Sequence, residues 1–483
     1  MTGITLLGLG PGNPKYLTRE AWQWLESISE IYLRTSQHPA VAGIPPTVKS
    51  VTFDTLFESG DDVAIIRQQI ATTILELGKR PEGVTYAVPG HPCMDISICE
   101  EINKRATDQG IPVRVIEGLS IVEPIARAVG VNPYSRLVLI DAHLLARRYV
   151  PNFPPNLPVL ISQIDSKQVA AEVKMVLAGV YPDDHPVILV HAITTDEELV
   201  EHLKLFEIDH NLHLSALSSL YIQPMDENYA FESFQEVVAR LRAPDGCPWD
   251  REQTHLSLRQ HLLEECYETL EAIDSGNTDE LREELGDLLL QIVLNAQIAS
   301  EGGKFNMADV TNGISTKIIS RHPHVFGDVK IEGVGGVLKN WEKLKEQERQ
   351  DNGGTKKGLM DGAPASLPAL AYAHEIQDRA ARVGFDWPEI DGVIAKVHEE
   401  LEEVLSAKDP LEQEKEIGDL AFAVVNLARW LKVDPESALR ESNRRFKHRF
   451  AHIEDTARRR KVDLSSLGFK EMDRLWEEAK DNE

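Results

Sequence analysis

A run of acidic residues late in the chain has the residue types and the spacing of a metal site. The stretch HEELEEVLSAKDPLEQEKEIGDL, residues 398–420, contains nine Asp or Glu residues and two Lys residues. Glu400 and Glu403 are three residues apart, so they lie along one side of a helix. Glu416 and Asp419, also three apart, predict a neighbouring helix that runs back the other way. A solvated helix face normally mixes in Lys or Arg four residues away, whereas a metal site does not.

Carboxylate oxygens gathered at one point repel one another, so their pKa values rise unless a cation is present. Mg²⁺ suits such a site because it prefers oxygen ligands and binds through carboxylates together with substrate phosphates. We therefore predict a helical hairpin that binds Mg²⁺ through Glu399, Glu400, Glu403, Glu416 and Asp419. An earlier segment offers the equivalent set Glu264, Glu265, Glu268, Glu284 and Asp287.

These two sets belong to an internal repeat in the second half of the chain. Four landmarks, GxxW, EExxE, ExGDL and WExxK, recur in the same order. They read GCPW, EECYE, EELGDLLLQIV and WEKLK in the first copy, and GFDW, EELEE, KEIGDLAFAVV and WEEAK in the second. A single EExxE is usually solvated surface, but a duplicated EExxE and ExGDL hairpin favours a metal site.

Each copy also has a pair of basic residues four positions apart, downstream of the carboxylates. The pairs are Lys317 with Arg321 and Arg445 with Arg449. Cations on one helix face of an acidic protein indicate phosphate oxygens as the ligand, although a charge-balancing face is the alternative. We expect hydrolysis of a phosphoanhydride by a metal-activated water, with one carboxylate as general base. The carboxylates assigned to catalysis are Glu265, Glu268, Glu400 and Glu403.

The two copies differ beyond the ExGDL landmark. The second copy has Asn426 and Arg429 where the first has Leu294 and Gln297. Asn and Arg can hold a sugar or a phosphate, which favours the second copy as the stronger catalyst; ordinary variation is the alternative reading. The tryptophans of the GxxW landmarks, Trp249 and Trp387, are also assigned to substrate binding.

The elements that position these residues change type near residue 225. Before it, predicted strands alternate with predicted helices, which is typical of an α/β domain. The strands are predicted in ITLLGLG, GVTYAVPG, VRVIEG, RLVLIDA, LPVLIS and PVILVHA, and the helices over 19–31, 62–77 and 167–178. After it, the apolar residues follow a helical period. The linker DNGGTKKGLMDGAPAS separates the copies, so we predict domains at 1–225, 231–350 and 366–483.

Composition narrows the classes of function. The formal net charge of −27 argues against broad nucleic-acid binding, which relies on basic surface. No apolar run approaches the roughly 20 residues of a membrane-spanning helix, and MTGITLLGLGPGN lacks the basic start of a signal peptide. The four cysteines form no CxxC pair, which favours reduced thiols and a cytoplasmic protein.

Residues 231–483 resemble the MazG family of all-α nucleoside triphosphate pyrophosphohydrolases, in the form with two modules. The segments GCPWDREQTHLSL, LLEECYE, ELGDLLLQIV and RHPHVFGDV carry the resemblance in the first module, and KEIGDLAFAVVNLAR and ESNRRFKHRF carry it in the second. The resemblance implies Mg²⁺-dependent cleavage between the α- and β-phosphates of a nucleoside triphosphate, giving a monophosphate and pyrophosphate. It also implies a homodimer, because a partner subunit completes such bundles.

The first half resembles the tetrapyrrole methylase family through ITLLGLGPGNPKYLT, YAVPGHPCMD and VIEGLSIVEPIARAVG. The resemblance implies two α/β lobes with S-adenosylmethionine bound between them. By position it assigns to the cofactor Leu9, Gly10, Gly90, His91, Met94 and Ser120. His91 departs from the Asp that methylases commonly have there. A methylase-like domain followed by two MazG modules resembles the YabN-like fusion proteins.

Three functions follow from these patterns. The first is a nucleotide pyrophosphohydrolase with an appended methylase-like domain. The second is a methyltransferase whose helical half serves dimerisation or nucleotide sensing. The third is a nucleotide-sensing module without turnover, which nucleotide plus Mg²⁺ would stabilise by mass action.

Overall fold

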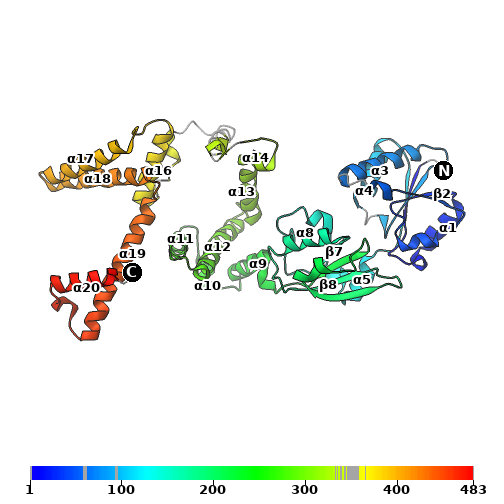
Figure 1. Ribbon diagram of the computed structural model, residues 1–483, viewed down its shortest axis with the longest axis horizontal. Coiled ribbons are helices and arrows are strands. Elements are labelled where there is room, and N and C mark those ends of the chain that lie inside the picture. The colour runs from blue at the N-terminus through cyan, green and yellow to red at the C-terminus, as the bar shows by residue number, and fades with distance from the viewer. Residues whose placement is uncertain are drawn as a thin grey trace. The chain divides into compact units, whose positions relative to one another are not determined.

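The computed structural model describes residues 3–57, 63–92, 96–331, 333, 335–337, 340–341, 344, 358–364 and 366–481. The chain divides into two compact units, Met1–Arg251 and Glu252–Glu483 (Figure 1). The first unit is α/β and the second is helical throughout its described residues, as the sequence predicts. The predicted domain limits at 225, 231, 350 and 366 stay predictions.

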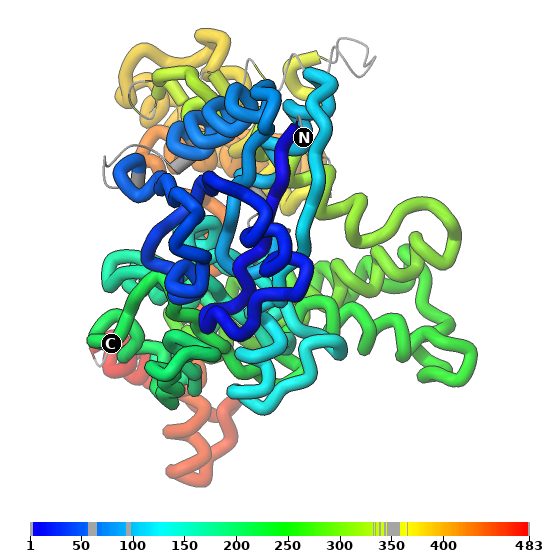
Figure 2. Tube along the Cα trace, turned by 90° about the vertical axis from the view of Figure 1, so that its right-hand side faces the viewer, coloured from blue at the N-terminus to red at the C-terminus, as the bar shows by residue number. Residues whose placement is uncertain are grey.

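The first lobe of the α/β unit is built on a parallel five-stranded sheet of order β3-β2-β4-β1-β5. Its strands are β1 (Ile4–Gly8), β2 (Glu30–Leu33), β3 (Lys49–Thr52), β4 (Val84–Val88) and β5 (Val113–Ile116). The alternation along β1 sends Ile4 and Leu6 into one core and Leu7 into another. The helices α3 (Val63–Gly78) and α4 (Ile96–Asp108) lie side by side over the first core, and α1 (Arg19–Ser27) covers the second (Figures 1 and 2).

The second lobe has a mixed five-stranded sheet of order β6-β7-β10-β8-β9, in which only β6 and β7 are parallel. Its strands are β6 (Val138–Asp141), β7 (Val159–Ser162), β8 (Pro186–His191), β9 (Leu199–Lys204) and β10 (Ser218–Ile222). The helices of the rest of this unit are α2 (Asp54–Phe57), α5 (Val122–Val129), α6 (Pro133–Arg136), α7 (Ala142–Leu145), α8 (Lys167–Leu177), α9 (Phe231–Arg242) and α10 (Pro248–Glu252). Arg34 of the first lobe reaches Gln163 of the second, with 3.4 Å between Nη2 and Oε1.

All six strands predicted from the sequence are present, as β1, β4, β5, β6, β7 and β8. The sequence pattern missed β2, β3, β9 and β10. The predicted helix over 19–31 was too long, because α1 ends at Ser27 and β2 begins at Glu30. A four-residue strand next to a helix carries too few positions for its period of two to be separated from the helical period.

The helical unit contains two hairpins of antiparallel helices, α11 (Leu258–Ser275) with α12 (Thr278–Glu301) and α17 (Ile390–Ser406) with α18 (Pro410–Trp430). The other helices are α13 (Met307–Arg321), α14 (Pro323–Phe326), α16 (Ala369–Arg382), α19 (Pro435–Arg460) and α20 (Phe469–Asp481). Side chains at the two turns fix where the return helices begin: Asn277 accepts hydrogen bonds from the amides of Asp279 and Glu280, and Asp409 caps α18 in the same way. Among the described residues, no helix combines the length and the apolar character needed to cross a bilayer.

The GFDW turn before α17 is tied to the end of α18 through one carboxylate. Asp386 Oδ1 accepts hydrogen bonds from Arg429 Nη2 at 2.5 Å, from Trp430 Nε1 at 3.0 Å and from the Trp387 amide at 2.9 Å. Burial would raise the pKa of Asp386, but the bonds from Arg429 and Trp430 more than reverse this and hold the pKa below its ordinary value. Arg429 also donates to Asn426 Oδ1 from both Nε and Nη2. The two residues assigned to substrate binding therefore form part of the scaffold of the second hairpin.

Replacing Arg429 tests this structural role. We expect Arg429→Ala to lower the free energy of local unfolding of α18 by about 1–3 kcal/mol, because the Asp386 carboxylate, whose side chain is 24% exposed, loses its charged donor. The measurement is hydrogen exchange of the α18 amides. Lys480→Ala, which removes only an exposed pair with Glu477, should change stability by less than about 0.5 kcal/mol. Normal exchange with a large loss of nucleotide affinity would instead assign Arg429 to the substrate.

Candidate metal centre

The first hairpin brings carboxylates of two helices to one place. Glu265 and Glu268 of α11 and Glu284 of α12 each offer an oxygen within 4.8 Å of the others. Burial raises the pKa of Glu265, and the charges of Asp287 and Glu268 raise it further. Burial and the charges of Glu268 and Asp287 raise the pKa of Glu284 in the same sense. This cluster therefore favours either a proton or a cation.

A hydroxyl beside these carboxylates links the two helices. Thr269, one position after Glu268, is buried, and its Oγ1 lies 2.7 Å from the Glu265 carbonyl oxygen and 3.4 Å from the Glu284 carbonyl oxygen. The Thr269 hydroxyl thus contacts the main chain of one cluster residue on each helix, Glu265 on α11 and Glu284 on α12. The hairpin is held together at the level of the cluster.

The second hairpin gathers Glu400 of α17 with Glu416 and Asp419 of α18, again with oxygens within 4.8 Å. Glu400 is only 5% exposed, and its Oε2 has no hydrogen-bond partner. Burial and the charges of Glu400 and Glu416 raise the pKa of Glu403. A buried carboxylate oxygen without a partner is costly, and a cation would satisfy it.

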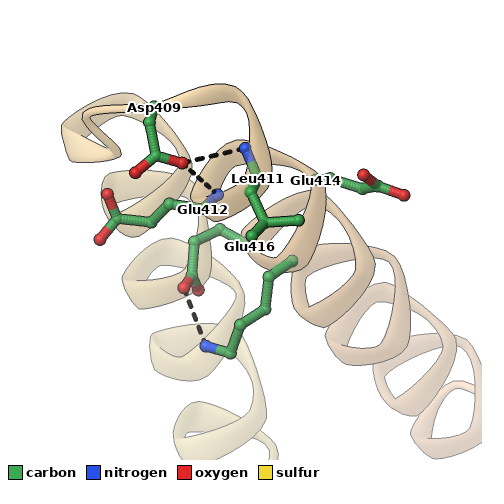
Figure 3. A pocket seen from close by; sticks show the side chains of 6 residues that line it. Asp409, Leu411, Glu412, Glu414 and Glu416 are labelled. Carbon is green, nitrogen blue, oxygen red and sulfur yellow. Dashed lines mark hydrogen bonds and ion pairs between the residues drawn. The ribbon is translucent and has the colours of Figure 1, made fainter.

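Two lysines that the sequence interpretation did not use lie in this second cluster. Lys396 Nζ is 2.8 Å from Glu399 Oε1 and 2.7 Å from Glu400 Oε1, and Lys415 Nζ is 3.0 Å from Glu416 Oε1. Figure 3 shows the carboxylate of Glu416 directed to this ammonium, while Glu414 points to another side of α18. The spacing of four residues from Lys396 to Glu400 was the available signal, but Lys396 lies two positions before the acidic stretch.

The donor set fits a hard divalent cation. All the converging atoms are carboxylate oxygens, which Mg²⁺ prefers, and Glu400 keeps an unpartnered oxygen in the cluster. The first Glu of each EExxE lies outside the clusters: Glu264 and Glu399 are exposed and contact His261 and Lys396, respectively. The clusters thus contain part of each predicted ligand set, and the assignment of individual ligands stays a prediction.

The predicted phosphate-binding cations lie on α13 and α19, next to the tryptophans of the WExxK landmarks. Arg321 stacks over the Trp341 ring at 5.2 Å, and Arg449 over the Trp476 ring at 5.5 Å. Arg445 donates to Glu441 and Ser442 of its own helix, and Lys317 is exposed. The sequence interpretation used the WExxK tryptophans only as landmarks. The Arg–Trp contact occurs in both copies, so each of these tryptophans contacts a predicted phosphate-binding arginine. The GxxW tryptophans, Trp249 and Trp387, are 54% and 45% exposed.

In the α/β unit, three loops at the carboxyl ends of β1, β4 and β5 pack main chain against main chain. Gly10 and Gly90 exchange two backbone hydrogen bonds of 3.0 and 2.8 Å. A Cβ at Gly118 would lie 2.2 Å from the Gly90 carbonyl oxygen, so a side chain is excluded there. Gly90 has a φ of +68° and open space on its own Cβ side. The glycines form a cradle that a ligand can approach closely.

Three more residues assigned to S-adenosylmethionine, Leu9, His91 and Ser120, lie within two positions of the cradle glycines. Leu9 is buried, and His91 follows Gly90 directly. Ser120 Oγ accepts a hydrogen bond of 2.9 Å from the Val122 amide at the start of α5. Met94 lies outside the described residues.

The loop after β8 adds a residue that the sequence did not single out. Thr194 has a φ of 70°, which a β-branched residue rarely adopts, and its buried Oγ1 has no hydrogen-bond partner. That hydroxyl lies 2.9 Å from where a Cβ of Gly12 would stand, so the second lobe meets the glycine-rich loop of the first. The cradle and an orphaned hydroxyl fit a polar cofactor between the lobes.

Comparison with known proteins agrees with both resemblances. Residues 253–326 match the MazG nucleotide pyrophosphohydrolase domain, and residues 3–209 match the Tetrapyrrole (Corrin/Porphyrin) Methylases. The nucleoside triphosphate pyrophosphohydrolase/pyrophosphatase MazG of Thermotoga maritima is 49% identical over 52% of this chain and 95% of its own length. The nucleoside triphosphate pyrophosphohydrolase of Escherichia coli K12 is 42% identical over 51% of this chain and 95% of its own.

One relative matches from end to end. The uncharacterized protein YabN of Bacillus subtilis is 38% identical, and the alignment covers 99% of both chains. The chain therefore belongs to the same family as YabN, with a tetrapyrrole methylase domain in its first half and a MazG region in its second.

Proposed function

We propose that the protein is a Mg²⁺-dependent nucleoside triphosphate pyrophosphohydrolase, which converts a nucleoside triphosphate and water to a nucleoside monophosphate and diphosphate. The observation that carries the proposal is the convergence of three carboxylates within 4.8 Å in each of two hairpins. The hairpins lie in the half of the chain that is 49% identical to the Thermotoga maritima enzyme. We place this activity in the cytoplasm, where nucleoside triphosphates are the available substrates.

The residues serve three roles, and Glu268 and Glu403 serve two of them. Mg²⁺ would be held by the clustered carboxylates, with Asp287 joining Glu265, Glu268 and Glu284 in the first hairpin and Glu403 joining Glu400, Glu416 and Asp419 in the second. When bound, it neutralises the triphosphate and activates the attacking water. Glu268 and Glu403, both exposed, accept the proton that the water loses. The cations of α13 and α19 hold the phosphates.

Product analysis tests the reaction. We expect monophosphate and diphosphate from a panel of ribo- and deoxyribonucleoside triphosphates, only with Mg²⁺ present. Changing Glu265, Glu268, Glu400 and Glu403 together to Gln should lower the rate by about 100-fold or more, because both general bases and part of each metal-holding set are lost. Ion-exchange chromatography measures the products. Glu402→Gln is the matched control, since this exposed carboxylate of α17 belongs to neither cluster.

The paired variants also compare the modules. Glu400→Gln with Glu403→Gln should cost more activity than Glu265→Gln with Glu268→Gln if the second module is the stronger catalyst. Unchanged turnover in the fourfold variant would refute the proposal.

We further propose that the protein works as a homodimer. Apolar side chains at positions 285, 289 and 292 form an exposed stripe on α12, and 263, 267 and 270 form one on α11. A Cβ at Gly286 would meet no atom within 4 Å, so there is room beside the carboxylates for a second copy or a substrate. Exposed apolar stripes of this kind favour association.

Sedimentation of the full chain tests the dimer. We expect a dimer for the native chain, and dissociation for Leu289→Glu with Ile292→Glu, because burying two carboxylates in an apolar contact is unfavourable. Leu212→Glu, at an 82% exposed site of the α/β unit, should leave the dimer intact. A native chain that sediments as a monomer at micromolar concentration would contradict the proposal.

A second candidate function is methyl transfer from S-adenosylmethionine. The cradle of Gly10, Gly90 and Gly118 and the orphaned Thr194 hydroxyl support binding of this cofactor between the lobes. The cofactor would supply an activated methyl group. The protein would hold the cofactor against the main chain of the cradle, where the glycines have no side chain to obstruct it.

Calorimetry with S-adenosylmethionine tests this second candidate. We expect binding in the micromolar range, weakened by Gly90→Val, because a β-branched residue is strained at φ +68° and fills the open side of the cradle. Gly110→Val has a similar φ of +66° and also meets open space, so it controls for strain alone. The absence of any heat with native protein would remove this candidate.

A further inference from the structure

The two hairpins differ in the cations that accompany their carboxylates. In the second, Lys396 contacts Glu399 and Glu400, and Lys415 contacts Glu416 and Asp419 at 3.0 and 3.6 Å. When the EExxE and ExGDL landmarks of the two copies are superposed, His261 takes the position of Lys396 and Glu283 takes that of Lys415. The first hairpin thus has six carboxylates and no lysine at these positions, and the second has five carboxylates and two lysines.

We propose that Lys396 and Lys415 act as an internal substitute for metal in the second hairpin, an inference that rests on the proposed function. Its carboxylates are already neutralised in part, so metal binds there only together with a polyphosphate whose oxygens draw the two ammonium groups away. The first hairpin lacks these ammonium groups and binds metal without nucleotide. The two modules therefore differ in how metal and nucleotide binding are coupled.

The exposure of the lysines suits this exchange. The side chain of Lys415 is 71% exposed and that of Lys396 is 37% exposed, so neither is locked by packing. An ammonium on a flexible four-carbon stem can change partners at little cost, whereas a bidentate guanidinium would not. The carboxylates that pair with each lysine belong to its own helix and lie one to four residues away, and pairs of this kind contribute little to stability. A triphosphate can therefore compete for them.

Space and an unsatisfied ligand are both present. A surface hollow at the start of α18 is lined by Lys415 and Glu416 together with Asp409, Leu411, Glu412 and Glu414 (Figure 3). Glu400 is 5% exposed and pairs with Lys396 through Oε1, while its Oε2 has no hydrogen-bond partner. The lysine thus satisfies one oxygen of this buried carboxylate and leaves the other for a cation.

Electron paramagnetic resonance of Mn²⁺ measures the difference directly on the full chain. Glu400→Gln with Glu416→Gln isolates the first hairpin, and Glu265→Gln with Glu284→Gln isolates the second. Without nucleotide, we expect the isolated first hairpin to bind Mn²⁺ at least about tenfold more tightly than the isolated second, because opposing ammonium charges weaken cation binding. An α,β-methylene triphosphate analogue should raise the Mn²⁺ affinity of the second hairpin and change the first much less.

The lysine variants then test the cause. In the chain with only the second hairpin, Lys396→Met with Lys415→Met should raise the nucleotide-free Mn²⁺ affinity and abolish its dependence on the analogue. Lys415→Met alone, at an exposed site where folding is not at risk, should produce part of this change. Lys408→Met removes a lysine from the turn of the same hairpin and should produce none.

Equal nucleotide-free Mn²⁺ binding by the two hairpins, or unchanged coupling in the lysine variants, would overturn the inference. These outcomes are separate from failure of the proposed function, which is read as the absence of products. If the protein releases products but its hairpins bind Mn²⁺ equally, this inference is wrong and the proposed function stands. If Mn²⁺ binds as expected but no triphosphate is hydrolysed, the proposed reaction is wrong and the difference between the hairpins stands.

Discussion

Mutual repulsion of carboxylates at one end of a helical hairpin is the constraint on which the helical half depends. Three carboxylate oxygens within 4.8 Å of one another are unfavourable unless protons or cations accompany them. The first hairpin leaves this repulsion in place, and it adds to the effect of burial in raising the pKa values of Glu265 and Glu284. The second reduces it with two lysines from its own helices. One repeated framework therefore presents two different electrostatic environments.

The framework must hold these charges together against their repulsion, and it does so with contacts outside the carboxylates. Side-chain caps at Asn277 and Asp409 fix the starts of the return helices. The Thr269 hydroxyl touches both helices of the first hairpin. In the second, Asp386 joins the turn before α17 to Arg429 at the end of α18. Each of these contacts is a hydrogen bond to a charged or main-chain group, and the one between Arg429 and Asp386 is charge-assisted.

The α/β half builds its candidate site by the opposite means. Its loops bring main chain against main chain, because glycines at positions 8, 10, 90 and 118 let the backbones approach to hydrogen-bond distance. Any Cβ at Gly8 or Gly118 would collide with neighbouring backbone. The helical half can therefore handle a polyanion through cations, whereas this half offers shape and main-chain donors to a polar ligand.

The sequence by itself determined the alternation of strands and helices, the internal repeat and the two acidic hairpins. It did so because helical spacing places Glu400 and Glu403 on one face whatever surrounds the helix. Only the tertiary structure decided which carboxylates converge, since Glu399 and Glu400 are adjacent in the chain but one is exposed and the other buried. Tertiary packing also decided that Arg429 holds a turn, because its partner Asp386 is 43 residues away. Local periodicity records the direction of a side chain, but burial and long-range pairing depend on what packs against it.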